Sequence, residues 1–240
     1  MNPGKQASTH LRANDETTLV DVGVYSYLEG FPLNCWFSLH TDKAGVDRSR
    51  VHDFFVSFMH QVSTWVHRTI GQPIRYEYVL ENPPPGSVPG KHGGLNIHVL
   101  LHMPLPLWPR FSSLACGSLI RGWIEQAGGT YKATVIELER LWWADRSDPE
   151  NYLRHGLFGA LIYVLKGLDP EVKSVLGVER EFQGLIDGKR CGHSQSLSPS
   201  KRTWSPEKLD RLRLARRVFG IDVLADAPLG DSSNPKDADQ

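Results

Sequence analysis

The apolar run LNIHVLLHM (95–103) constrains the fold of this chain more than any other segment. A glycine pair precedes it and Pro104 follows it, so only nine residues are available for regular structure. Such a length is short for a helix and typical of a strand. In a strand Asn96, His98 and His102 share one face of the sheet. The alternative is a helix, in which His98 and His102 would form a zinc pair.

Strand and helix patterns alternate along the rest of the chain. Segments rich in β-branched and aromatic residues predict strands at 34–41, 74–81, 95–103 and from residue 131 onward. Helical spacing of apolar residues predicts helices over 47–70, 111–127 and 148–167. The order β-α-β-β-α-β-α predicts an α+β fold: an antiparallel sheet in a split βαβ (ferredoxin- or RRM-like) arrangement, with helices packed on it.

Composition limits the size and the setting of the protein. The 240 residues are 40% hydrophobic, which suffices for one domain with extensions. Polar composition predicts disorder over 1–17 and 225–240, which leaves a domain at 18–180 and a basic extension at 181–224. The three cysteines lie far apart, and the chain shows neither a signal peptide nor a membrane-length apolar run. These features predict a cytoplasmic protein without a membrane partner.

A carboxylate and an amide join His98 in a predicted metal site. Glu81 ends one strand and the chain then returns into Asn96, so a hairpin would place Glu81 beside Asn96 and His98. Side chains at i and i+2, about 6.6 Å apart, can share an ion, whereas His98 and His102 would be about 13 Å apart. Carboxylate, imidazole and amide oxygen suit Mg²⁺ or Mn²⁺. The alternative is a half-buried strand histidine and a solvated strand-end charge.

Tyr163 and Lys166 form a second constellation. They are three residues apart on the predicted helix 148–167 and so lie on one face. A phenol with a pKa of about 10 is a weak nucleophile near neutral pH. A neighbouring ammonium and a polarised phosphate promote its attack on phosphorus. The alternative for such a pair is packing plus a surface charge.

Taken in order, these residues resemble the motifs of the HUH endonucleases, the family of rolling-circle replication initiators and relaxases. WFSLHTD (36–42) is similar to the first family motif, a strand of the type F-x-T-L-T. ENPPPGSVPGKHGGLNIHVLLHMP (81–104) is similar to the second and GALIYVLKG (159–167) to the third. GKRCGHSQSLSPSKR (188–202) resembles a segment of bacterial and phage-type replication proteins. The resemblance covers about 33–167, and 188–217 more loosely.

The resemblance implies metal-dependent, site-specific nicking and joining of single-stranded DNA, which initiates rolling-circle-type replication of a plasmid, phage or mobile element. Tyr163, on a helix after the last strand, would attack the scissile phosphate and form a 5′-phosphotyrosine. Lys166 would stabilise the developing charge. Glu81, Asn96 and His98 would hold Mg²⁺ or Mn²⁺.

The chain departs from the family pattern at one position, because the first motif histidine is Asn96 here. Three interpretations stay open. Asn96 is a working ligand, or His92 or His102 takes its place, or the chain is a degenerate, non-catalytic single-stranded DNA-binding protein on the same fold. A zinc hydrolase that uses His98 and His102 on a helix is the interpretation outside the family.

Basic residues gather near the C-terminus although Lys plus Arg and Asp plus Glu both number 27. Basic side chains with an aromatic among them suit a phosphate backbone and a stacked base, and a solvated amphipathic helix is the alternative. The predicted DNA contacts are Lys189, Arg190, Lys201, Arg202, Trp204 and Arg211. The chain lacks a GxxxxGK[ST] motif, so a host helicase would unwind the replication origin and a host polymerase would extend the primer.

Overall fold

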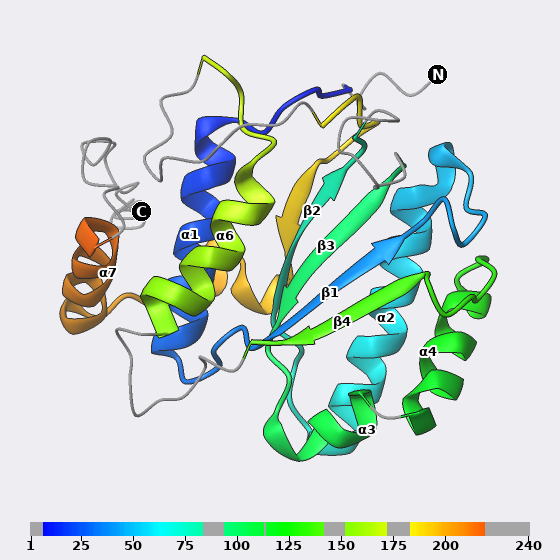
Figure 1. Ribbon diagram of the computed structural model, residues 1–240. Coiled ribbons are helices and arrows are strands. Elements are labelled where there is room, and N and C mark those ends of the chain that lie inside the picture. The colour runs from blue at the N-terminus through cyan, green and yellow to red at the C-terminus, as the bar shows by residue number, and fades with distance from the viewer. Residues whose placement is uncertain (1–6, 84–93, 113, 142–151, 172–182, 219–240) are drawn as a thin grey trace, which may run out of the picture.

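A computed structural model describes residues 7–83, 94–112, 114–141, 152–171 and 183–218 of this chain. At its centre is a five-stranded antiparallel sheet, which confirms the expected α+β class (Figure 1). Its strands are β1 Cys35–His40, β2 Tyr76–Glu81, β3 Asn96–Leu101, β4 Ile136–Arg140 and β5 Cys191–His193. They lie in the order β4-β1-β3-β2-β5. Within the described ranges, no helix combines the length and the hydropathy needed to cross a membrane.

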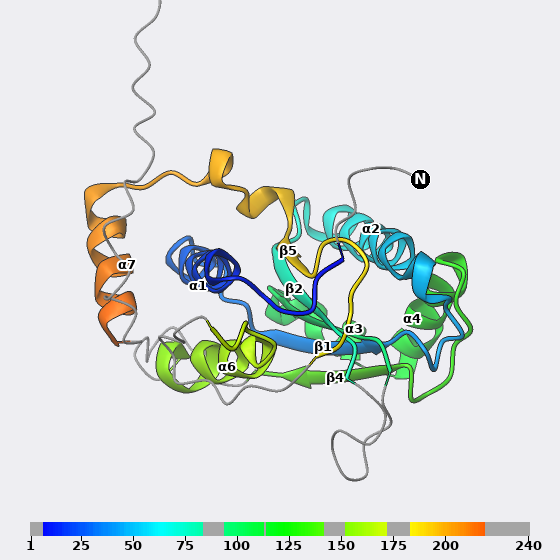
Figure 2. The same cartoon turned by 90° about the horizontal axis from the view of Figure 1, so that it is seen from above.

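Helices cover both faces of the sheet (Figures 1 and 2). The helices α2 (Val51–Ile70) and α4 (Leu114–Gln126) pack on one face. The helices α1 (Ala13–Leu28) and α6 (Phe158–Leu165) pack on the other. The short helix α3 (Trp108–Ser112) precedes α4, and α7 (Pro206–Val218) packs beside α1.

The two faces of the sheet differ in chemistry because side chains alternate along each strand. The face toward α2 and α4 is apolar and fully buried, with Phe37, Leu39, Ile97 and Val99 at its centre. Each such side chain contributes about 1.5–3 kcal/mol when it leaves water. The face toward α1 and α6 carries the polar residues Ser38, His40, Glu81, Asn96 and His98. Buried polar groups stabilise a fold little or not at all, so this second face indicates a site.

The strand at residues 96–101 settles the first alternative. His98 lies within β3 and His102 lies after its end. The alternative of a helix on which these two histidines form a zinc pair is therefore wrong. The predicted helix over 47–70 is confirmed as α2, which ends where Gly71 adopts a left-handed backbone with φ of 71°. The predicted last helix includes a π-helical turn over Tyr152–Leu157 that leads into α6. Its expected first residues, 148 and 149, lie outside the described ranges.

Two expectations about the ends of the chain differ from the structure. Disorder through residue 17 is wrong for the last five of those residues, because α1 begins at Ala13. The chain just before α1 is also held in place, since the Leu11 amide donates to the Gly167 carbonyl at 2.8 Å. From the expected basic extension, β5 joins the sheet as a partner of β2. This extension therefore contributes to the central sheet.

Candidate functional site

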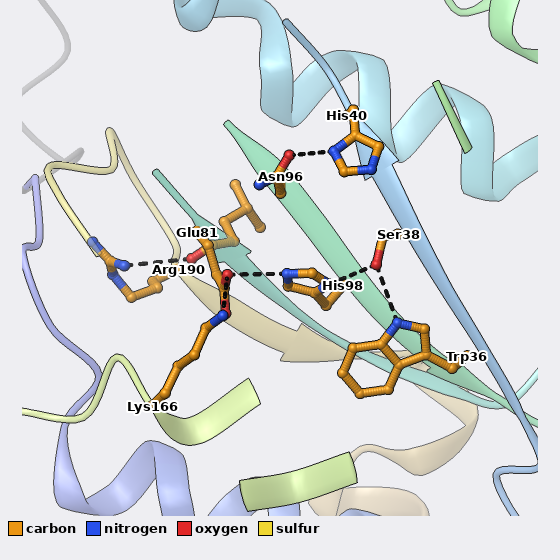
Figure 3. Close-up of polar contacts among 9 residues, drawn as sticks. Trp36, Ser38, His40, Glu81, Asn96, His98, Lys166 and Arg190 are labelled. Atoms are coloured by element: carbon orange, nitrogen blue, oxygen red, sulfur yellow. Dashed lines mark hydrogen bonds and ion pairs between the residues drawn. The ribbon is translucent and has the colours of Figure 1, made fainter. Parts of the chain in front are cut away.

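Glu81 is the centre of a polar cluster between the sheet and α6 (Figure 3). This residue ends β2, is buried and faces Asn96 directly across the β2–β3 ladder. One oxygen, Oε2, lies 3.0 Å from Nε2 of His98 and 3.1 Å from Nζ of Lys166. The hairpin thus brings together Glu81, Asn96 and His98, as the sequence predicts, and adds Lys166 from the end of α6.

The charges of this cluster support one another. Burial by itself would raise the pKa of the Glu81 carboxyl, but His98 and Lys166 outweigh burial and leave that pKa below its usual value. Burial would likewise lower the pKa of Lys166, yet Glu81 and Tyr163 raise it above its usual value. Near neutral pH the site therefore contains a carboxylate and an ammonium, both held in their charged forms.

The ring of His98 is oriented from the neighbouring strand. Its Nδ1 lies 2.7 Å from Oγ of Ser38, which is directly opposite on β1. The indole Nε1 of Trp36 donates to the same Oγ at 3.1 Å. These contacts turn Nε2 of His98 toward Glu81, the arrangement by which outer groups orient a ligating histidine. The sequence interpretation assigned no role to Ser38 or Trp36, although strand alternation places both on the face of His40.

Tyr163 lies over this cluster at the surface of α6. Its side chain is 38% exposed, and its ring packs edge-on against Trp36 and His98 with centroids 5.1 and 5.3 Å apart. The ammonium of Lys166 lies 3.9 Å from the centroid of the Tyr163 ring. The expected common face of Tyr163 and Lys166 is therefore present. The arrangement places an accessible phenol above an imidazole, a carboxylate and an ammonium.

Asn96 has a partner that the sequence interpretation missed. His40 faces it across the β1–β3 ladder, with Nδ1 of His40 2.7 Å from Oδ1 of Asn96. On its other side Nε2 of His40 lies 3.1 Å from Oε1 of Glu137, on β4. The sequence did contain a hint of this role, because His40 lies in WFSLHTD and shares a strand face with Ser38.

Glu81 and His98 carry donor atoms of the kind that binds a divalent cation. Among the described residues, Oε1 of Glu81 is buried without a hydrogen-bond partner, and Nε2 of His98 is buried with Oε2 of Glu81 3.0 Å away. A carboxylate oxygen beside an imidazole nitrogen suits Mg²⁺ or Mn²⁺. Across the described ranges, no three His, Cys, Asp or Glu side chains are grouped so that they could hold a metal ion. The third ligand expected from the sequence is Asn96, whose Oδ1 is turned toward His40 in this structure (Figure 3).

His102, the other candidate histidine within the described ranges, does not reach the cluster. His102 lies beyond β3, where its Nδ1 is 2.8 Å from the Pro32 carbonyl and its ring meets Phe31 edge-on. Those contacts hold His102 against the loop that precedes β1. His92 lies outside the described residues.

Three of the residues predicted to contact DNA pack or hydrogen-bond within the protein itself. Arg190 is 4% exposed and donates to the backbone carbonyls of Ser8 and Gly184 at 2.8 and 2.5 Å. Arg202 is half-buried and donates from Nε to the Leu197 carbonyl at 2.9 Å. Trp204 packs edge-on against a tyrosine of α1, with ring centroids 4.9 Å apart. These contacts account for the three side chains without DNA.

The other three predicted contacts keep their charged groups at the surface. Lys189 and Lys201 are exposed, on either side of β5. Arg211 is exposed on α7 and pairs with Glu207 one turn earlier at 2.8 Å. An exposed pair of this kind contributes little to stability, so Arg211 remains free to exchange its partner for a phosphate.

Comparison of the chain with models of protein families, with characterised proteins and with solved structures finds no match. The interpretation of the site therefore rests on its own geometry. That geometry combines an exposed phenol with buried groups of three kinds, and these are a carboxylate, an imidazole and an ammonium.

Proposed function

We propose that this chain is a metal-dependent endonuclease of the HUH type that nicks and joins single-stranded DNA through a phosphotyrosine intermediate. One observation carries the proposal: Tyr163 on α6 lies over His98, whose Nε2 faces the carboxylate that Lys166 also contacts. A tyrosine that served packing alone would not need a buried carboxylate and ammonium below it. Buried charges of this kind cost free energy and are typical of functional sites.

The order of the strands supports the finer fold proposed here, a split βαβ arrangement. β3 lies between β1 and β2, and both intervening helices, α2 and α4, pack on one face. That leaves the opposite face of the central strand, which carries Asn96 and His98, for the helix with Tyr163. The proposed catalytic helix is thus the element that closes the polar face.

The proposed chemistry is a transfer of one phosphodiester bond. The Tyr163 oxygen attacks the scissile phosphorus and loses its proton, while the bond from phosphorus to the 3′ oxygen breaks and that oxygen takes up a proton. The products are a free 3′-OH and a 5′-phosphotyrosine. Attack by a 3′-OH on the phosphotyrosine reverses the exchange and joins strands. Bond number is conserved, so no external energy source enters either step.

The residues around Tyr163 have defined tasks in this scheme. The Lys166 ammonium stabilises negative charge as the phenol loses its proton and the phosphate becomes more negative. Glu81 keeps Lys166 charged, and Ser38 keeps the His98 ring in one orientation. A cation held by Glu81, Asn96 and His98 would polarise the phosphate.

The proposed partners follow from the same scheme. Single-stranded DNA at a replication origin is the substrate, and the exposed Lys189, Lys201 and Arg211 are the basic side chains that could follow its backbone. A host helicase and a host polymerase would act on the opened origin in the cytoplasm.

A second candidate function, non-catalytic binding of single-stranded DNA, is favoured by the amide at residue 96. A cleavage assay separates the two candidates. A random-sequence pool of single-stranded DNA is incubated with and without Mn²⁺, with Tyr163→Phe as the test variant and Tyr131→Phe as the matched control on the far face. An endonuclease gives Mn²⁺-dependent fragments that only Tyr163→Phe abolishes. Retention of uncut DNA by all three proteins would support the binding protein.

A further inference from the structure

We infer that a pocket beside the β2–β3 hairpin binds one nucleobase that carries an exocyclic amino group. The pocket has a volume of about 200 Å³. The lining residues that decide its ligand are Arg48, His52, Leu80, Leu95, Ile186 and Asp187. None of them takes part in the proposed cleavage. The inference rests on the proposed function for one source of the base, a strand of single-stranded DNA.

The pocket lies at the same end of the sheet as Glu81, on the opposite face. Leu80 directly precedes Glu81 on β2, and Leu95 directly precedes Asn96, the first residue of β3. Leu80 and Leu95 belong to the apolar core beneath α2, whereas Glu81 and Asn96 lie on the polar face. A DNA strand whose scissile phosphate lies at Tyr163 therefore has its neighbouring nucleotides at this end of the sheet.

The floor of the pocket is apolar and its rim is polar. Leu80, Leu95 and Ile186 are buried, whereas Arg48 and Asp187 are exposed. A flat ring can lie against such a floor and keep its polar edge at the rim. Pockets for drug-sized ligands measure about 300–1,000 Å³. A smaller pocket suits a single ring system, such as one base.

The polar groups of the pocket match the edge of an amino-bearing base. Nδ1 of His52 is buried and has no hydrogen-bond partner among the described residues. A buried polar atom without a partner costs free energy, which a ligand that hydrogen-bonds to it recovers. The carboxylate of Asp187 accepts hydrogen bonds and donates none. It therefore selects the amino group of cytosine or adenine over the carbonyl at the same edge of thymine or uracil.

A phosphate is the less suitable occupant of the pocket itself. The Asp187 carboxylate would repel an anion, and the apolar floor would offer it no hydrogen bonds. The guanidinium of Arg48 donates to the Leu185 carbonyl. Arginine has five N–H donors, so Arg48 keeps others at the rim for the phosphate attached to the bound nucleotide.

The walls of the pocket are joined before a ligand arrives. The contact of Arg48 with Leu185 ties the turn that precedes α2 to the segment that precedes β5. The Asn82 side chain donates to the same carbonyl at 3.0 Å. Ile186 and Ser8 exchange two backbone hydrogen bonds, both 2.9 Å long. Walls that are already in place lower the cost of ordering on binding.

Methyl NMR of the full chain tests the pocket without reference to cleavage. The nucleotides dCMP and dUMP, which differ at the amino edge of the base, are added separately. We expect dCMP to shift the methyl signals of Leu80, Leu95 and Ile186, while the exposed Leu105 serves as the control. The native protein should bind dCMP at least about tenfold more tightly than dUMP, as for other hydrogen bonds that read a base edge. Homopolymers of dC and dU repeat the comparison for a base held in a strand.

Asp187→Asn is the decisive variant, because it keeps the size of the side chain and replaces an acceptor by an amide. It should lose the preference for cytosine over uracil. Asp53→Asn, at an exposed position of α2 outside the pocket, is the matched control and should keep that preference. Equal binding of the two bases by the native protein would overturn the inference, as would methyl signals that no nucleotide or homopolymer shifts.

The source of the base is read from the same spectra. Selective shifts with the dC homopolymer support a base of single-stranded DNA, and selective shifts with dCMP alone support a free nucleotide in the same pocket. The proposed function is tested apart from the pocket. A DNA adduct on Tyr163 with unmoved methyl signals overturns the inference alone. Selective binding of cytosine without any adduct overturns the proposed cleavage alone.

Discussion

Replacement of Lys166 by Met tests whether the ion pair of Lys166 and Glu81 stabilises the folded protein as a buried pair does. The substitution keeps most of the apolar stem and removes the ammonium that contacts Glu81 at 3.1 Å. The Glu81 side chain is 3% exposed and that of Lys166 11%, so water cannot easily replace the lost partner. We therefore expect a large loss of stability from a single substitution.

The size of the stability loss depends on the partners that Glu81 keeps in the variant. Loss of one member of a buried ion pair costs about 3–5 kcal/mol, and His98, still 3.0 Å from the same oxygen, should keep the loss near about 3 kcal/mol. For a chain of this size that corresponds to a fall in Tm of about 6–12 °C. Addition of Glu81→Gln should restore most of the stability, because the double variant leaves no unpaired charge.

The pH dependence has a definite sign. The folded-state pKa of Glu81 lies below its usual value, so its contribution to stability is present above the unfolded pKa of about 4.3 and is lost as the pH falls through the folded pKa. Urea unfolding of the native protein and Lys166→Met should differ at pH 7 and converge below about pH 4. A difference under about 0.5 kcal/mol at pH 7 would refute the reasoning, because it is the size expected of an exposed pair.

Three further outcomes follow from the same contacts. Glu77→Gln should stabilise the protein by about 1–3 kcal/mol at pH 8 and less at pH 5, because neither oxygen of Glu77 has a hydrogen-bond partner among the described residues. Burial raises the pKa of Glu77, so the stability of the native protein falls as the pH rises above the unfolded pKa. Urea unfolding at both pH values measures this, and a loss of stability at pH 8 would contradict it. His98→Ala should abolish Mn²⁺-dependent cleavage while His102→Ala leaves it nearly intact, because only His98 faces Glu81. Equal loss of cleavage in both variants would contradict this assignment. Asn96→His should lower the Mn²⁺ concentration for half-maximal cleavage more than the Mg²⁺ concentration, since imidazole is the better donor to Mn²⁺; an unchanged titration would mean that residue 96 is not a ligand.

Local sequence patterns predicted the elements that periodicity defines. Strong alternation or helical spacing marked β2, β3 and α2, and the hairpin geometry brought Glu81 to Asn96. The first helix, α1, was missed because its opening turn is polar and its buried residues form no clear stripe. Tertiary packing, rather than local preference, accounts for α1.

The parts of the site that escaped prediction depend on which strands become neighbours. Ser38 contacts His98 and His40 contacts Asn96, across about 60 positions of sequence, through the register of β1 and β3. Neither contact has a local signal. Arg190 shows the converse, because a basic residue in a glycine-bounded loop resembles a DNA contact, yet the backbone carbonyls of Ser8 and Gly184 hold it inside.

The covalent adduct tests the central claim most directly. Single-stranded DNA of random sequence, labelled at its 3′ end, is incubated with the full chain and Mn²⁺, and the protein is denatured, digested and sequenced by mass spectrometry. The proposed function predicts a 3′-labelled fragment joined through its 5′-phosphate to the peptide that contains Tyr163, and no such product from Tyr163→Phe. Cleavage without any adduct, or an adduct on another residue that survives Tyr163→Phe, would contradict it.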